Sequence, residues 1–144
     1  MLEIEGKFGL NHGEVSLRTQ SRWQKITSGN YNLLLADSSA INLTTGSNNV
    51  IAGYNSGTSL TTQNNHVIIG SQAGKSLQSG NNGVIIGYNS VPNTQLSDGS
   101  TYIGSQIMSG TNAGLYFNSN TSNTMIGYGI CSNNLFESAQ YCAL

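Results

Sequence analysis

A 17-residue period runs through most of this chain. A glycine closes four consecutive copies, Gly53, Gly70, Gly87 and Gly104, and Ala36 holds the same place in the copy before them. A leucine column keeps the same spacing: Leu43, Leu60 and Leu77. A sixth copy, NTMIGYG, reaches Gly127 after a gap of 23, which predicts an insertion around TNAGLYFNSN. A self-similarity of this kind indicates a repeat architecture, in which each copy packs on the next.

The apolar residues of each copy predict strands. They lie in runs such as VIIG, bounded by Gly, Asn, Ser and Thr, and not at helical spacing. We expect two short strands and two turns in each 17-residue unit, stacked at about 4.8 Å as coils of a parallel β-solenoid. The fold class is then all-β, with about six coils in a column about 25 to 30 Å tall.

Three columns of strand residues are apolar. The first column is Leu33, Val50, Val67, Val84, Thr101 and Thr124. The central column is Leu34, Ile51, Ile68, Ile85, Tyr102 and Met125. The third column is Leu35, Ala52, Ile69, Ile86, Ile103 and Ile126. Because side chains alternate along a strand, the first and third columns share one face and the central column takes the other. An apolar outer face predicts a second copy of the chain as its cover; folding of the two turns over it within one chain is the alternative.

Polar residues on both sides of each strand form further columns. Two residues after the glycines stand Asn55, Gln72, Asn89 and Gln106. Just before the strands stand Asn48, Asn65 and Asn82. We expect these amides to shape turns and to hydrogen-bond along the stack, as in side-chain ladders of stacked strands.

Composition excludes several partners. Charged residues are 8% of the chain, the net charge is −1 and the pI is about 6.0, so the chain has no basic surface for nucleic acid. No apolar run is long enough to span a membrane, and MLEIEGKFGL lacks the apolar core of a cleaved signal. Cys131 and Cys142 are too few for a disulfide framework, and their redox state stays open.

No catalytic or metal-binding constellation emerges. His12 falls in an expected turn, and His66 stands where Asn32 and Asn49 stand in other copies, so both have structural explanations. The acids Asp37, Asp98 and Glu137 are scattered along the sequence. We therefore expect no enzyme activity, no cofactor and no metal.

The ends do not follow the repeat, which predicts three regions: an N-terminal cap (1–29), the roll (30–129) and a C-terminal cap or tip (130–144). KFGLNHGEVSLR predicts a β-hairpin with its turn at residues 11 to 13. Trp23 and Ile26 would seal the first coil, with sugar stacking as the alternative for Trp23. Leu135, Phe136 and Tyr141 would cover the other end.

The copies NNVIAGYNSGTSLTTQ, NNHVIIGSQAGKSLQSG and NNGVIIGYNS resemble the head repeat of trimeric adhesins of the YadA type, and related repeats of phage, viral and mosaic trimeric fibres. The resemblance covers roughly residues 30 to 129 and is strongest over 48 to 90. It implies a left-handed parallel β-roll and a side-by-side homotrimer whose strand columns divide between the roll core and the threefold axis. The resemblance does not fix which strand columns form the roll core and which face the threefold axis. A trimeric mass in solution would favour the central column as the surface between chains. No heptad stalk, membrane anchor or self-cleaving chaperone domain follows the repeat, so the chain is either a small trimer or a piece of a longer fibre.

The functional hypothesis is a trimeric fibre or head module in surface attachment, at a virion or cell surface. Its candidate ligand-binding residues follow the glycines: Tyr54, Asn55, Gln72, Tyr88, Asn89, Gln106 and Tyr128. One alternative is a carbohydrate-binding module, because Tyr54, Tyr88 and Tyr128 offer rings on alternate coils. A weaker alternative is an ice-binding solenoid, suggested by the pairs Thr44–Thr45 and Thr61–Thr62.

Overall fold

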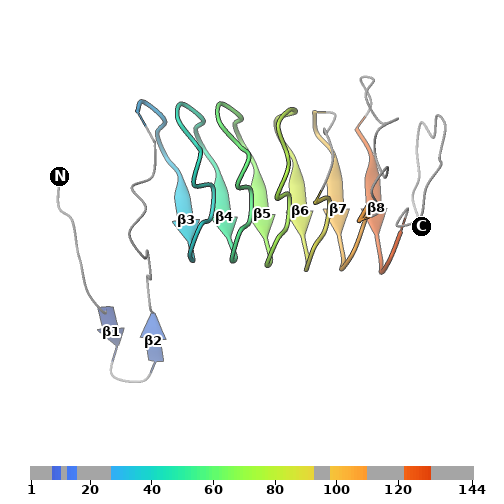
Figure 1. Cartoon of the computed structure of the whole chain (residues 1–144), viewed down its shortest axis with the longest axis horizontal. Helices are drawn as coiled ribbons and strands as arrows, with labels where there is room; N and C mark the ends of the chain where they lie inside the picture. Colours follow the sequence, from blue (N-terminus) through green and yellow to red (C-terminus); the bar gives the residue numbers. More distant parts are fainter. Residues whose placement is uncertain (1–7, 11–12, 16–26, 93–97, 110–121, 131–144) are drawn as a thin grey trace.

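The computed structural model describes residues 8–10, 13–15, 27–92, 98–109 and 122–130. Within these ranges the chain holds a two-stranded and a six-stranded sheet and no helix (Figure 1). The two short strands are β1 (Phe8–Leu10) and β2 (Gly13–Val15). The six strands of the larger sheet are β3 (Leu33–Leu35), β4 (Val50–Ala52), β5 (Val67–Ile69), β6 (Val84–Ile86), β7 (Thr101–Ile103) and β8 (Thr124–Ile126).

The six-stranded sheet is parallel, and its strands follow one another in chain order. Val50 pairs with Val67 and Val67 with Val84, so each step along the sheet is one 17-residue period. The last step pairs Thr101 with Thr124, which is 23 residues on. The predicted β-solenoid is confirmed, with four turns of 17 residues and one longer turn. The extra residues leave the strand register unchanged, as the sequence predicts.

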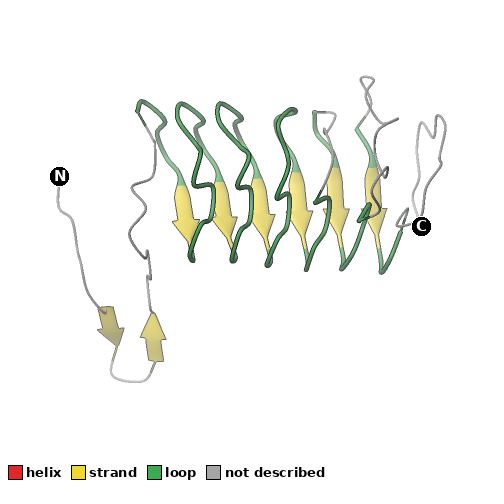
Figure 2. Ribbon diagram, viewed as in Figure 1, coloured by secondary structure: helices red, strands yellow, loops and turns green. Residues whose placement is uncertain are grey.

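Within the described residues each coil contains one strand, and the expected second strand is not formed there (Figure 2). On the return leg, the amide of each column leucine donates to a carbonyl three residues earlier: Leu43 to Ala40, Leu60 to Gly57 and Leu77 to Gly74. These local turns take donors that a second strand would need for its neighbour. The legs are still tied together, for example by the amide of Thr44, which donates to the carbonyl of Thr61 at 2.8 Å.

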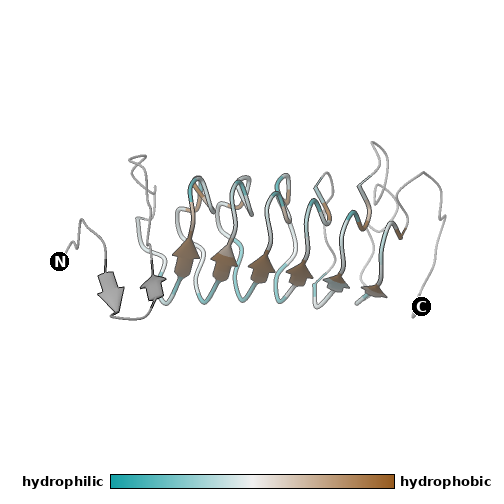
Figure 3. Cartoon of the chain, turned by 90° about the horizontal axis from the view of Figure 1, so that it is seen from below, coloured by the Kyte–Doolittle hydropathy of each residue, from teal (hydrophilic) through white to brown (hydrophobic). Residues whose placement is uncertain are grey.

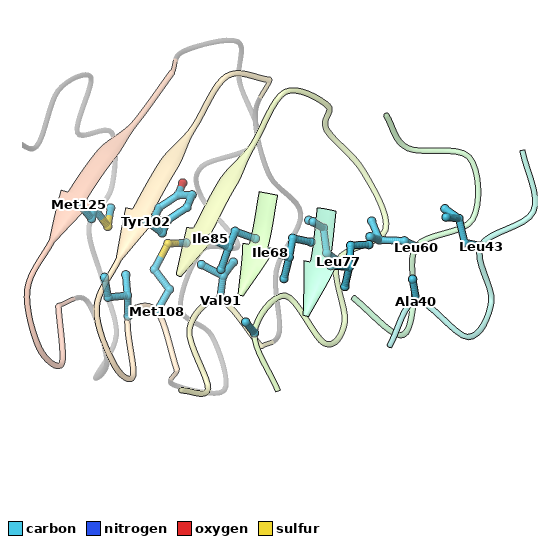
Figure 4. Close-up of a cluster of buried hydrophobic side chains, with 13 residues drawn as sticks. Ala40, Leu43, Leu60, Ile68, Leu77, Ile85, Val91, Tyr102, Met108 and Met125 are labelled. Carbon is cyan, nitrogen blue, oxygen red and sulfur yellow. The ribbon is translucent and has the colours of Figure 1, made fainter. Parts of the chain in front are cut away.

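The central strand column forms the core of the roll. Ile51, Ile68, Ile85 and Tyr102 are fully buried, and Met125 is 1% exposed (Figure 4). The leucine column packs into the same cluster from the return leg: Leu43, Leu60 and Leu77. The sequence left open whether this column faces the roll core or other chains, and the structure places it in the core. The first and third columns lie on the outer face, because alternate side chains of a strand point to opposite sides.

In the described coils the strands are hydrophobic and polar turns flank them, while further hydrophobic residues lie on the return leg (Figure 3). The fifth coil keeps this pattern despite Pro92, which is buried, because Thr101 still pairs with Val84. Leu96, which stands two residues beyond the leucine position of the repeat, lies outside the described residues, as does most of the expected insertion, at residues 110–121.

The expected hairpin is present near the N-terminus. β1 and β2 pair antiparallel with Leu10 opposite Gly13, and residues 11 and 12 of the expected turn lie outside the described residues. Its role as a cap stays a prediction, because residues 16–26, including Trp23 and Ile26, lie outside the described residues. His12 also lies outside the described residues, as do residues 131–144 of the expected C-terminal cap, 130–144, with Cys131, Leu135, Phe136, Glu137, Tyr141 and Cys142.

Candidate functional site

The outer face of the six-stranded sheet is an apolar surface. We call it the outer ladder; its aliphatic members are Leu33, Leu35, Val50, Ala52, Val67, Ile69, Val84, Ile86, Ile103 and Ile126. All are half-buried or exposed in the single chain, and Leu33 and Ile126 are each more than half exposed. Since the strands are in register, the surface is continuous over six strands, about 24 Å. Its first column ends in Thr101 and Thr124, whereas the third stays aliphatic throughout.

Tyrosines border the outer ladder at the corners that follow alternate strands, β4, β6 and β8. Tyr54, Tyr88 and Tyr128 come directly after column glycines and are 55%, 53% and 76% exposed. Ser71 and Ser105 hold the same place in the intervening coils and are half-buried. The five residues therefore form one edge of the roll, which we call the tyrosine edge.

The amide column beside the tyrosine edge is fixed by its backbone. Asn55, Gln72, Asn89 and Gln106 have φ between 48° and 59°, the left-handed conformation of a tight turn. The backbone amide of each of these residues donates to a backbone carbonyl of the preceding coil. The amide of Gln72, for example, donates to the carbonyl of Tyr54 at 2.8 Å. Within the described chain no hydrogen bond joins these four side chains, so the ladder expected among them is not formed. Asn and Gln alternate along the column, and their amide groups stand at different distances from the backbone.

The second expected ladder, before the strands, is formed in part. Asn65 donates from Nδ2 to Oδ1 of Asn82 at 3.0 Å. Asn48, Asn65 and Asn82 all have φ near 60°, so these residues also shape the turn that enters the strand.

Another side-chain ladder was not predicted. Its members keep the 17-residue spacing: Asn30, Ser47, Asn64, Asn81 and Asp98. The side-chain oxygen of each later member accepts from the backbone amide one coil earlier, as Oδ1 of Asn81 does from Asn64 and Oδ1 of Asp98 from Asn81, both at 2.8 Å. The signal in the sequence is the recurrence of short oxygen-bearing side chains at this spacing.

His66 belongs to a buried polar column inside the roll. Its backbone amide donates to Oδ1 of Asn49 at 2.9 Å, and Asn49 in turn donates from Nδ2 to Oδ1 of Asn32 at 3.0 Å. Nδ1 of His66 accepts from the amide of Gly83 at 3.1 Å, and Nε2 lies 3.1 Å from the carbonyl of Gly80. The ring is therefore neutral, with its proton on Nε2. The structural role expected for His66 is confirmed.

The stability of the roll should fall when His66 is protonated. Burial lowers the pKa of His66 below its ordinary 6.5, while the Gly80 carbonyl and the charge of Asp98 oppose the shift in part. A proton on Nδ1 would also break the bond from Gly83. The stabilisation is thus complete above pH 6.5 and is lost as the pH falls from 6.5 through the lowered pKa of the folded state. Urea denaturation between pH 8 and pH 5 measures this loss.

His66→Asn is the matched control, because Asn49 and Asn32 hold the same place in earlier coils. The variant keeps His12 and should unfold with a flatter pH profile over that range. A profile that is as steep as that of the wild type would assign the pH dependence to another group.

The described coils are poor in charged and metal-ligating side chains. They hold no group of three His, Cys, Asp or Glu side chains placed to bind a metal ion. The described residues include no helix that is long and apolar enough to cross a membrane. In the described coils only Asp37, Lys75 and Asp98 are charged. The arrangement can therefore bind through apolar, aromatic and neutral polar groups.

Comparison of the chain with protein-family models, with curated proteins and with solved structures gave no match. The fold defines the class, a parallel β-solenoid of 17-residue coils, and function must be argued from its surfaces.

Proposed function

We propose that this chain is a non-enzymatic module of a trimeric fibre or head, which acts in attachment at a virion or cell surface. The observation that carries the proposal is the outer ladder, a continuous apolar surface on one side of a narrow roll. Contiguous apolar surfaces of this kind are rarely left in water by soluble proteins.

A second copy of the same surface is the simplest cover. The described turns lie at the ends of the strands and leave Leu33, Val50 and Ile69 exposed, so the described part of the chain does not cover the ladder. Three rolls side by side around a threefold axis would turn the same columns of each chain inward and would close the assembly. The resemblance of the repeat to trimeric adhesin heads favours three copies over two.

Light scattering on a sizing column tests this assembly. We expect a mass near three times 15.2 kDa. Ile69→Lys should reduce the mass to that of one chain while the circular dichroism spectrum is kept, because Ile69 is 40% exposed in the single roll and a lysine there can reach water. In the trimer the same charge would be buried without a partner.

Thr62→Lys is the matched control. Thr62 is exposed on the return leg, so a lysine at this position adds the same charge away from the outer ladder. It should leave the trimeric mass unchanged. A wild-type chain that elutes as a folded monomer would rule out the trimeric fibre. A mass of two chains would keep the outer ladder as an interface and reject the threefold arrangement.

Attachment requires a rigid support and a surface that binds a ligand. The coil-to-coil hydrogen bonds and the buried core give each roll a fixed geometry. The chain would act without cofactor, metal or nucleic acid, and its partners would be its own copies and a receptor or glycan on the surface that it contacts.

A further inference from the structure

The tyrosine edge repeats every second coil, although the fold repeats every coil. The dipeptides that follow the glycines are Tyr54–Asn55, Ser71–Gln72, Tyr88–Asn89 and Ser105–Gln106, and Tyr128 follows in the last described coil. Both positions of the dipeptide therefore alternate with a period of two coils. The buried columns do not share this period, because Ile51, Ile68 and Ile85 are the same residue in successive coils.

The local structure does not require this alternation. The second residue of each dipeptide has the same left-handed backbone, with φ of 55° at Asn55 and 59° at Gln72. Tyr54 and Tyr88 are each more than half exposed, and neither belongs to the core cluster. A single exposed aromatic ring needs no explanation, but three in line at equal intervals form a regular array.

Hydrogen bonds along the edge fix the spacing of the array. The amides of Gln72, Asn89, Gln106 and Gly129 donate to the carbonyls of Tyr54, Ser71, Tyr88 and Ser105 respectively, at 2.8 to 3.0 Å. Consecutive coils are about 4.8 Å apart, so the tyrosines recur at about 10 Å along the roll, with a serine in each gap. The result is a rigid row of rings separated by short hydroxyl side chains.

The chemistry of the row suits a neutral carbohydrate. Tyrosine rings can stack on the C–H faces of sugars, and serine hydroxyls and side-chain amides can bond to sugar hydroxyls. From Tyr54 to Tyr128 the edge carries no charged residue, and Asp37 takes the equivalent place only in the first coil. An anionic ligand would therefore find no cation along the row.

The period of the row selects among carbohydrates. In an extended β-1,4-linked chain each sugar is turned over relative to the one before, so the same face recurs at every second ring. Each sugar of such a chain also advances by about one coil spacing. We propose that the tyrosine edge binds an extended, neutral β-1,4-linked polysaccharide that lies parallel to the roll axis. Tyr54, Tyr88 and Tyr128 stack on alternate sugars, and Ser71 and Ser105 face the sugars between them.

This site supplies the ligand of the attachment function and in that sense rests on it. The two proposals can fail separately, because the solution mass reports the assembly and a titration reports the ligand. A folded monomer that still binds β-1,4-linked oligosaccharides would reject the fibre and keep the site.

Isothermal titration with cello-oligosaccharides and chito-oligosaccharides of two, four and six sugars tests the site on the full chain. We expect affinity to rise with each added pair of sugars, and malto-oligosaccharides of equal length, whose α-linkages bend the chain, to bind at least about tenfold more weakly. Tyr88→Ala removes the central ring and should weaken binding of the six-sugar ligand by about tenfold or more.

Tyr31→Ala is the matched control, because Tyr31 is 88% exposed but lies before the first strand, in line with Asn48 at the opposite corner. It should leave the affinity unchanged. The proposal is overturned if no β-1,4-linked ligand binds the folded protein, or if Tyr31→Ala weakens binding as much as Tyr88→Ala. It is also overturned if Tyr88→Ala lowers affinity only by changing the solution mass, since the ring would then belong to the interface between chains.

Discussion

Gly70→Ala is expected to destabilise the roll by about 3 kcal/mol or more, enough to remove much of the stability of an ordinary domain. A Cβ at residue 70 would lie 2.6 Å from the carbonyl oxygen of Gly87 and 2.8 Å from its carbon. Both are backbone atoms of a coil that is itself bonded to this one, since the amide of Gly87 donates to the carbonyl of Ile69. The φ of Gly70, 130°, is also one that L residues rarely adopt. Urea denaturation followed by circular dichroism gives the free energy of unfolding.

Gly74→Ala is the control for Gly70→Ala. Its φ of 56° is left-handed but accessible, and its Cβ would meet only side-chain ends, Cδ1 of Ile85 at 3.2 Å and of Ile68 at 3.3 Å. The chain already holds Ala40 and Val91 in this column, with φ of 45° and 52°. We expect a cost of about 1 to 2 kcal/mol. Equal losses in the two variants would show that the coils can move apart at Gly70, contrary to the contact seen with Gly87.

Ile68→Ala is expected to cost about 2 to 5 kcal/mol, the range for deleting a fully buried aliphatic side chain in a close-packed core. Ile68 has no exposed surface, and the side chains around it come from neighbouring coils that are held in register by backbone bonds. The walls of the cavity can therefore move little. The measurement is again the free energy of unfolding in urea.

Ile69→Ala separates the two faces of the same strand. Ile69 is the next residue and is 40% exposed, so in the dissociated chain its truncation should cost less than about 1 kcal/mol. If the outer ladder is an interface, this cost grows with protein concentration, whereas that of Ile68→Ala does not. A larger loss from Ile69→Ala than from Ile68→Ala in dilute protein would reverse the faces assigned to these residues.

The strand register could be predicted from the sequence because the glycine and apolar columns repeat at a fixed interval. The two faces of the strand could not be told apart in the same way. Val67, Ile68 and Ile69 are all apolar, so hydrophobicity gives no preference for the side that is buried. The structure settles it through the turns, which bring the return leg with Leu60 and Leu77 against Ile68 and not against its neighbours.

The number of strands in each coil could not be predicted from the sequence, for a related reason. The return leg carries Leu60 among polar residues, a pattern that a strand and a series of turns both allow. The choice depends on where backbone donors go, and the bond from Leu60 to Gly57 is visible only in three dimensions. The candidate surfaces were more predictable: Tyr54 and Tyr88 are exposed where the sequence placed them, although their ligand remains a proposal.

The last turn of the roll is longer than the others, yet Thr124 stacks on Thr101 in the same register as every earlier pair. The number of residues in a connection is thus independent of the geometry of the column. Foreign peptides could be inserted between Ser109 and Ser122, where the chain already departs from its period, without breaking the strand pairing on either side. A roll of this type is therefore a natural scaffold for displaying loops of variable length at a constant height along the stack of coils.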